Sequence, residues 1–207
     1  MRIIKVQGNG QASLPADTVR LTFNIECERF VYGDCVDELN NRVDQLRTCL
    51  AECNIEQREI KTSDFNITIN QEYKNGRYNL IGYRARHGLT LEIPFFQNTL
   101  NAVLNAIAKG GSNTSVSIAF SCSDKAQIKK MVLEDAVRKA RTNAEIMTAA
   151  AGVVLGDLVT MDYGWSEVRF YSDDSDMSIC ESGTPSPNFE PDDIKAMDMI
   201  TMVYEIH

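Results

Sequence analysis

The sequence predicts an α+β fold, in which antiparallel sheets carry helices packed on one face. Apolar and polar residues alternate from Asp17 to Glu28, which is typical of a strand with one solvated face. Residues 33–53 instead carry apolar side chains at spacings of three and four, which indicates a helix, with Asp34 as its expected N-cap. Farther on, Asn75-Gly76 favours a type I′ turn between two alternating segments. The expected element order is roughly β-β-α-β-β-α-β-α-β-β.

The length and composition are those of an ordinary folded protein. The chain has 207 residues, of which 43% are hydrophobic and 24% are charged. A chain of this length buries a substantial core. We therefore expect one domain over residues 1–207, or two closely packed lobes.

The hairpin around Asn75-Gly76 is predicted to contain a bulge. In its second arm, Tyr78 and Leu80 are in phase with the apolar face of the first arm, but from Tyr83 onward the pattern slips by one residue. Directly opposed residues share a face of the sheet, so one extra residue near Ile81-Gly82 is needed.

The rest of the chain continues the alternation of helices and strands. Pro94 is predicted to start a helix that ends near Ala108, and alternation from Ser115 to Cys122 predicts a strand. The longest helix is expected from about Ser123 or Asp124 to Ala151, closed by Gly152. A strand is expected over residues 158–168.

The last strand, Met197–Ile206, is apolar on both faces. Such a strand is either central in its sheet or covered at a subunit interface. The candidate interface residues are Met199, Ile200, Met202, Tyr204 and Ile206.

Residues 172–193 are predicted to form an acidic, flexible loop, because they hold seven acidic residues and no Lys or Arg. The cluster of aspartates that begins at Asp173 raises the possibility of a divalent cation. An EF-hand alignment from Asp174, however, places Ile179 at the required glycine and Pro185 at the required glutamate. A solvated loop is favoured, and divalent-cation binding stays an alternative.

No established catalytic pattern is present in the sequence. G-x-S-x-G, H-E-x-x-H and P-loop motifs are all absent, and His87 and His207 are the only histidines. A partly buried, hydrogen-bonded His87 is favoured, so we assign no catalytic, cofactor-binding or metal residue. The alternative is a small hydrolase, or a redox enzyme using thiols such as Cys35, Cys49 or Cys53, with a pocket around His87.

Gly8-Asn9-Gly10 suggests the beginning of a dinucleotide-binding fingerprint. The third glycine position holds Ser13, and the following residues lead into a strand instead of the helix that would hold a pyrophosphate. We predict a turn here.

The net charge and the cysteines limit which partners and which cellular compartment we expect. A formal charge of -8 disfavours binding to nucleic acid or anionic lipid, and no apolar run is long enough for a membrane span. The six cysteines are expected as free thiols. Because no signal peptide is visible, we expect a cytoplasmic protein, or a periplasmic or exported one if a leader has been removed.

Four short motifs follow one another along the chain: Ile4-x-Val6-x-Gly8-x-Gly10, Gly82-Tyr83-x-Ala85, an alanine-rich helix leading to Leu155-Gly156, and Val203-Tyr204-Glu205-Ile206. In this order and spacing they resemble the SIMPL-domain family from Ile4 to Ile206. Ala16, which separates Pro15 from Asp17, departs from the family pattern.

The resemblance implies an α+β fold with no catalytic residues to transfer, and large ring-like homo-oligomers among bacterial members. We therefore expect a non-enzymatic protein that acts through homo-oligomeric assembly and binding, with an unknown ligand. A bacterial source and a role in stress response enter this expectation only through the resemblance.

Overall fold

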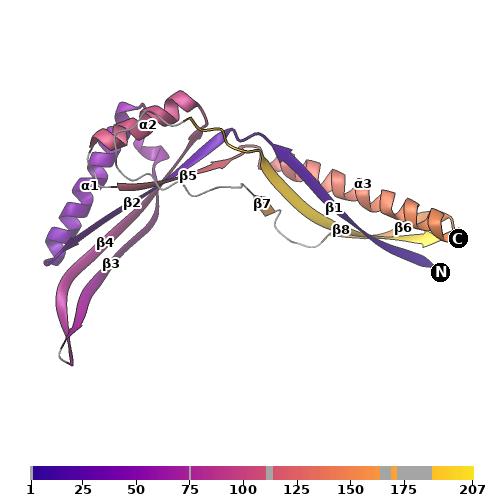
Figure 1. Cartoon of the computed structure of the whole chain (residues 1–207), viewed down its shortest axis with the longest axis horizontal. Coiled ribbons are helices and arrows are strands. Elements are labelled where there is room, and N and C mark those ends of the chain that lie inside the picture. Colours follow the sequence, from indigo (N-terminus) through magenta and orange to yellow (C-terminus); the bar gives the residue numbers. More distant parts are fainter. Residues whose placement is uncertain (1, 75, 111–113, 164–168, 172–187) are drawn as a thin grey trace. The chain divides into compact units, whose positions relative to one another are not determined.

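The computed structural model describes residues 2–74, 76–110, 114–163, 169–171 and 188–207, and it has the predicted α+β fold (Figure 1). Antiparallel sheets and helices alternate broadly in the expected order, with one short additional strand, β7 (Arg169–Tyr171). The chain divides into two compact units. Unit 1 comprises Met1–Ala16, Ser121–Asp173 and Pro191–His207, and unit 2 comprises Asp17–Phe120 and Asp174–Glu190.

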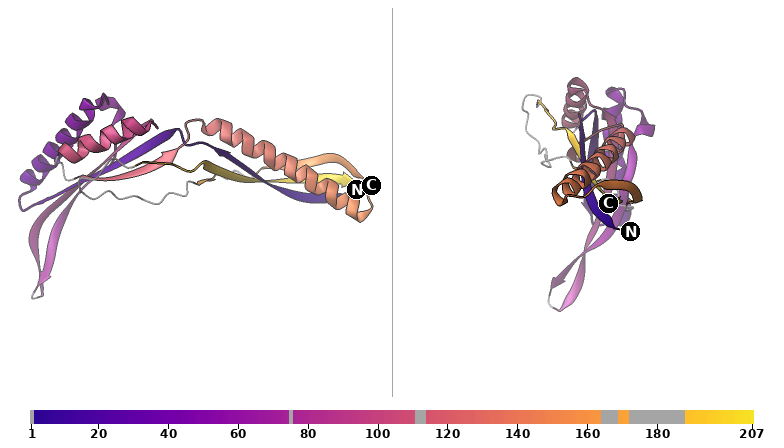
Figure 2. Two further views of the ribbon diagram at one scale, coloured as in Figure 1. Left: turned by 45° about the horizontal axis from the view of Figure 1, so that its top comes forward. Right: turned by 90° about the vertical axis from the view of Figure 1, so that its right-hand side faces the viewer.

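Unit 1 is a sheet covered on one face by a long helix. Its strands are β1 (Ile3–Leu14), β8 (Ile194–Ile206), β6 (Leu155–Asp162) and β7, and its helix is α3 (Lys125–Ala151). Strand β8 is central: β1 pairs with it from Ile3–Glu205 to Leu14–Ile194, and β6 and β7 also pair with it. Of the two alternatives expected for the terminal strand, the structure shows the first, a central place in its sheet. Figure 2 shows α3 running along this sheet.

Two glycines of β1 allow α3 to lie close to the sheet. A Cβ added to Gly8 would lie 2.0 Å from the Ala136 carbonyl oxygen, and one added to Gly10 would lie 2.0 Å from that of Val132. The predicted turn at Gly8-Asn9-Gly10 is wrong, because these residues lie inside β1. Glycine is required here because the helix backbone occupies the space of a side chain.

Unit 2 is a four-stranded sheet with two helices on one face. The strand order is β3 (Lys61–Lys74), β4 (Arg77–Pro94), β2 (Thr18–Arg29) and β5 (Thr114–Ser121). The helices α1 (Tyr32–Glu52) and α2 (Gln97–Gly110) supply apolar residues to a core shared with β2, β4 and β5, and a 3₁₀ turn, η1, covers Gln57–Glu59. As the alternation predicts, the inward face of β2 is fully buried from Val19 to Ile25.

The ends of α3 agree with the sequence. The carboxylate of Asp124 accepts a hydrogen bond from the backbone N–H of Gln127 at 2.7 Å, which makes it the N-cap. Gly152 follows the helix with a φ of 68°, a left-handed conformation that glycine adopts without strain.

Two other predicted helix starts are wrong. Pro94 is the last residue of β4 and pairs with Thr18, and α2 begins three residues later at Gln97. A proline is tolerated at the end of a strand, where a missing backbone N–H disturbs little of the ladder. Helix α1 begins at Tyr32 after the extended residue Val31, so Asp34 lies in the first turn and is not the N-cap.

Candidate functional site

The hairpin of β3 and β4 extends past the end of its neighbour β2 within unit 2 (Figure 1). The last pair between β2 and β4 is Arg29–Tyr83, so the residues of β4 before Tyr83 pair only with β3. We call the segment formed by Ile69–Lys74 and Arg77–Gly82 the arm. It is a two-stranded ribbon, an arrangement that is marginally stable in water by itself.

The predicted bulge at the base of the arm is confirmed. Gln71 pairs with Leu80 and Asn70 pairs with Gly82, which leaves Ile81 as the extra residue. Gly82 has a φ of 152°, and a Cβ there would lie 2.6 Å from the Arg29 carbonyl oxygen, so a side chain is strained at this position.

The turn of the hairpin is described only in part. Gly76 has a positive φ of 76°, as a type I′ turn requires. Asn75, the other residue of the predicted turn, lies outside the described residues.

One face of the arm is apolar and uncovered. Opposed residues share a face, so the pairs Ile69–Tyr83 and Tyr73–Tyr78 continue the face that buries Ala85 farther along β4. The exposed fractions are 58% for Ile69, 42% for Leu80, 64% for Tyr73 and 73% for Tyr78. The rings of Tyr73 and Tyr78 lie 4.9 Å apart between centroids. The core face of the sheet therefore continues onto a surface that none of the described helices covers.

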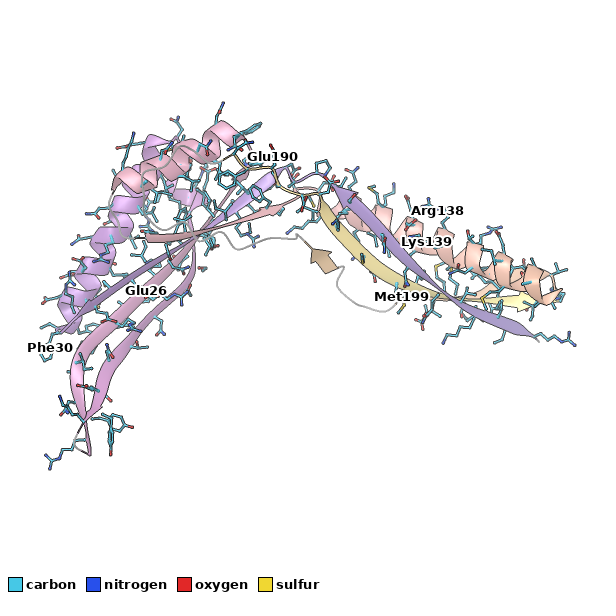
Figure 3. All side chains as sticks on the ribbon, in the orientation of Figure 1. Glu26, Phe30, Arg138, Lys139, Glu190 and Met199 are labelled. Atoms are coloured by element: carbon cyan, nitrogen blue, oxygen red, sulfur yellow. The ribbon has the colours of Figure 1, made fainter. Side chains whose placement is uncertain are left out.

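Exposed apolar residues also flank the base of the arm. Phe30, at the end of β2 in Figure 3, is 67% exposed and lines a small hollow of about 140 Å³ with Ile81. Tyr32 packs edge-on against Tyr83 with ring centroids 5.5 Å apart. These contacts extend the exposed apolar surface from the arm to the start of α1.

His87 has a hydroxyl partner. Its Nε2 lies 3.1 Å from the Thr62 hydroxyl, its ring packs edge-on against Phe65, and its buried Nδ1 has no partner in the part of the chain that the structure describes. Burial, followed by the positive charge of Arg47, lowers the pKa of His87, and Asp64 opposes this shift. The imidazole is therefore neutral at neutral pH, and it makes no hydrogen bond to a described carboxylate or thiol.

Four of the five described cysteines lie in two pairs, and neither pair makes a hydrogen bond to His87. Cys49 lies in the last turn of α1, Cys53 is the C-cap residue that follows the helix, and both are partly exposed. Cys27 and Cys35 are buried, with their Sγ atoms 3.7 Å apart. The sequence does not predict this second pair, because a spacing of eight residues across a strand end and a helix start carries no pairing signal.

Metal binding gains no support from the described residues. Over residues 2–74, 76–110, 114–163, 169–171 and 188–207, no group of three or more His, Cys, Asp or Glu is placed to hold a metal ion. Residues 172–187, which carry most of the predicted acidic loop, lie outside the described residues. Residues 188–193 are the described part of the predicted loop. There, Glu190 (Figure 3) accepts a hydrogen bond from the Asn188 side chain.

Three of the five candidate interface residues on β8 are core residues. Ile200, Met202 and Tyr204 are buried in a cluster with the alanines of α3. Met199 (Figure 3), on the opposite face of the strand, is 49% exposed, and Ile206 is partly exposed. The interface on this strand stays a prediction for Met199 and Ile206.

Two larger hollows lie elsewhere. One, of about 430 Å³, lies between β1 and α3 of unit 1 and is lined by Lys5, Gln7, Asn143 and neighbouring apolar residues. The other, of about 720 Å³, follows α1 of unit 2 as far as Gly110. Neither includes His87. No helix among the described residues is long and apolar enough to cross a membrane.

The fold and the arm define an α+β protein of two sheet-and-helix units, one of which carries an uncovered apolar hairpin. The chain belongs to the SIMPL family, described as proteins of unknown function (DUF541), whose family model matches residues 4–204. A comparison with curated proteins gives no match.

Solved structures resemble parts of the chain only weakly. A de novo designed protein, Foldit4, is 9% identical, with a TM-score of 0.23 over 52% of this chain and 99% of its own. An amidase of the hydantoinase/carbamoylase family from Burkholderia phymatum is 13% identical, with a TM-score of 0.24 over 57% of this chain and 29% of its own. At these scores neither likeness carries an argument about fold or function.

Proposed function

We propose that this chain is a non-enzymatic SIMPL protein that acts through homo-oligomeric assembly and binding, with the arm as a contact surface. The observation that carries the proposal is the uncovered apolar face of the arm, formed by Ile69, Tyr73, Tyr78 and Leu80. An apolar surface of this kind favours a partner, since covering it removes it from water. A partner would also stabilise a ribbon that has few contacts of its own.

The charge of the chain favours a second copy as that partner. The arm holds Glu72, Lys74 and Arg77 as its charged residues, for a net charge of +1. The remainder of the chain therefore carries -9, which is the total of -8 less +1. Opposite net charges attract the arm of one copy to the acidic body of another, whereas an anionic membrane repels the body.

Light scattering on the purified full chain tests the proposal. At micromolar concentration we expect a mass that is a multiple of 23.2 kDa. Ile69→Lys and Leu80→Lys should each weaken assembly by about tenfold or more, because burying one such apolar side chain contributes roughly 1.5 to 3 kcal/mol.

Asn79→Lys is the matched control, because Asn79 pairs with Glu72 on the polar face of the same ribbon. It adds the same charge and should leave the mass unchanged, while circular dichroism confirms that all variants are folded. A wild-type chain that stays monomeric would contradict the proposal, as would arm variants that assemble like the wild type.

The interface on the terminal strand is a second candidate for the same assembly. The exposure of Met199 supports it, and Met199→Lys in the same light-scattering experiment tests it. If Met199→Lys lowers the mass and the arm variants do not, the contact surface lies on unit 1.

A further inference from the structure

Two buried thiols lie close together where β2 meets α1. The Sγ atoms of Cys27 and Cys35 are 3.7 Å apart, and the two residues are 5% and 0% exposed. Cys27 is two residues from the end of β2, and Cys35 is in the first turn of α1. The end of β2 and the start of α1 are thus neighbours in sequence, and their two sulfur atoms are in contact.

The geometry is close to that of a disulfide. A disulfide holds its sulfurs about 2 Å apart, so the two Sγ atoms need to approach by less than 2 Å. Both cysteines lie near the ends of their elements, where the backbone adjusts most easily. The first turn of α1 is also lightly held, because its N-cap residue Val31 offers no side-chain hydrogen bond.

We propose that Cys27 and Cys35 are a modification site, at which a low-molecular-weight disulfide oxidises the two thiols to an intramolecular disulfide. One thiol, after losing its proton, attacks the oxidant and displaces half of it as a thiol. The second cysteine then attacks the mixed disulfide, releases the other half as a thiol and closes the Cys27–Cys35 bond. The two cysteines lose two protons and two electrons, and the oxidant gains both.

The reduced pair is stable at neutral pH until an oxidant arrives. Burial, together with the neighbouring Cys35 thiol, raises the pKa of Cys27 to about 11. The charged groups that act on this thiol are Arg42, which lowers the pKa, and Glu38, which raises it. Because the thiolate is the attacking form, the pair reacts slowly in the folded chain and faster when the first turn of α1 opens.

Oxidation would change the contacts at the base of the arm. Cys35 Sγ lies 3.4 Å from the carbonyl oxygen of Tyr83, to which it donates, and Cys27 Sγ donates to the carbonyl oxygen of Cys35 at 3.2 Å. A disulfide has no S–H group, so both carbonyls lose a donor while β2 becomes covalently joined to α1. The disulfide can form whether or not the chain assembles, and it is measured as a loss of two free thiols.

Refolding the full chain in a buffer of reduced and oxidised glutathione tests the proposal without requiring access to the buried sulfurs. After acid quenching and alkylation, mass spectrometry should show four of the six cysteines alkylated and a mass lower by two hydrogen atoms before alkylation. Proteolysis should yield a cross-link between Cys27 and Cys35 that dithiothreitol removes.

Matched variants distinguish this pair from the other thiols. Cys27→Ser and Cys35→Ser should each lose the cross-link, and the double variant Cys49→Ser/Cys53→Ser should keep it. Six alkylatable thiols in the refolded wild type would overturn the proposal, and so would a cross-link between any other two cysteines. If either single variant fails to fold, the cross-link map of the wild-type chain decides by itself.

Discussion

Asp135 is a buried carboxylate that fastens the edge strand β1 to α3. Its Oδ2 accepts a hydrogen bond from the backbone N–H of Gln11 at 2.9 Å and lies 2.8 Å from Nζ of Lys139, a residue of α3 labelled in Figure 3. Arg138 pairs with the other carboxylate oxygen. The hydrogen bond from Lys139, followed by those from Gln11 and Arg138, holds the pKa of Asp135 below its usual value of 3.8, although burial opposes the shift.

Asp135→Asn should lower the stability of unit 1 by about 1 to 3 kcal/mol at pH 7, because a hydrogen-bonded charge is replaced by a neutral amide. The folded pKa lies below the unfolded value of 3.8, so the carboxylate contributes fully above that pH and loses its contribution as the pH falls through the folded pKa. Urea unfolding should therefore show a smaller difference in the free energy of unfolding between wild type and variant near pH 3 than at pH 7. A difference in the free energy of unfolding that grows at acidic pH would contradict the lowered pKa of Asp135.

Contacts between residues far apart in the chain could not be predicted from the sequence. Asp135 and Gln11 are separated by 124 positions, and no local pattern joins them. The sequence placed Cys27 on the buried face of its strand, but the position of Cys35 beside it depends on how α1 packs. His87 was predicted to be partly buried and hydrogen-bonded, and it is, with Thr62 as its partner.

The packing of α3 on β1 requires glycine, which has no side chain, at positions 8 and 10 of the strand. Gly8→Ala would place a Cβ 2.0 Å from a carbonyl oxygen of α3, so the helix must move away. We expect a loss of about 1 to 3 kcal/mol or more in the free energy of unfolding, measured with urea. Gly33→Ala is the matched control.

Gly33 lies in the first turn of α1 with no atom within 4 Å of an added Cβ. Its replacement by alanine should be neutral or stabilise by up to about 1 kcal/mol, because alanine is the better helix former. Equal losses for the two alanine variants would show that the helix and strand do not pack as described.

Local periodicity predicts most of the helices and strands. The wrong predictions come from residue types that occur in two different structural settings. Glycine is common in turns, which predicts a turn at Gly8 and Gly10. In the structure, glycine instead permits a close approach between strand and helix. Proline marks helix starts, yet Pro94 ends a strand. The bulge at Ile81 was predicted because a slip in phase along a hairpin is itself a local signal.

The arm shows the limit of the same reasoning at the candidate site. Alternation identified the apolar face of β3, and it does not indicate whether a helix covers that face. Ile69 and Ala85 share the face, but Ala85 is buried and Ile69 is mostly exposed. The exposure of Ile69 follows from where β2 ends and α1 begins, which is a property of the folded unit.

At the scale of the molecule, the buried clusters are separate: one lies in unit 2, and two lie in unit 1. Leu39 belongs to the core of unit 2, and Ile200 belongs to the cluster under α3 in unit 1. Leu39→Ala should cost about 2 to 5 kcal/mol and lower amide hydrogen-exchange protection in β2, β4 and α1. Protection in β1, β8 and α3 should change little.

Ile200→Ala provides the reverse control, with protection lost in β1, β8 and α3 and kept in unit 2. If either substitution lowers protection evenly across both units, the two clusters unfold as one cooperative body and the division into units has no thermodynamic meaning.

The central place of β8 also sets an order for folding during synthesis. Strand β1 leaves the ribosome before β8, which begins about 180 residues later, from Leu14 to Ile194. At roughly 5 to 20 residues per second, β1 waits for about 10 to 40 s. The strands and helices of unit 2 are all translated within that interval. A nascent chain therefore carries β1 without its partner strand while unit 2 already has its strands and helices. During that interval the backbone groups of β1 are open to pairing with another chain.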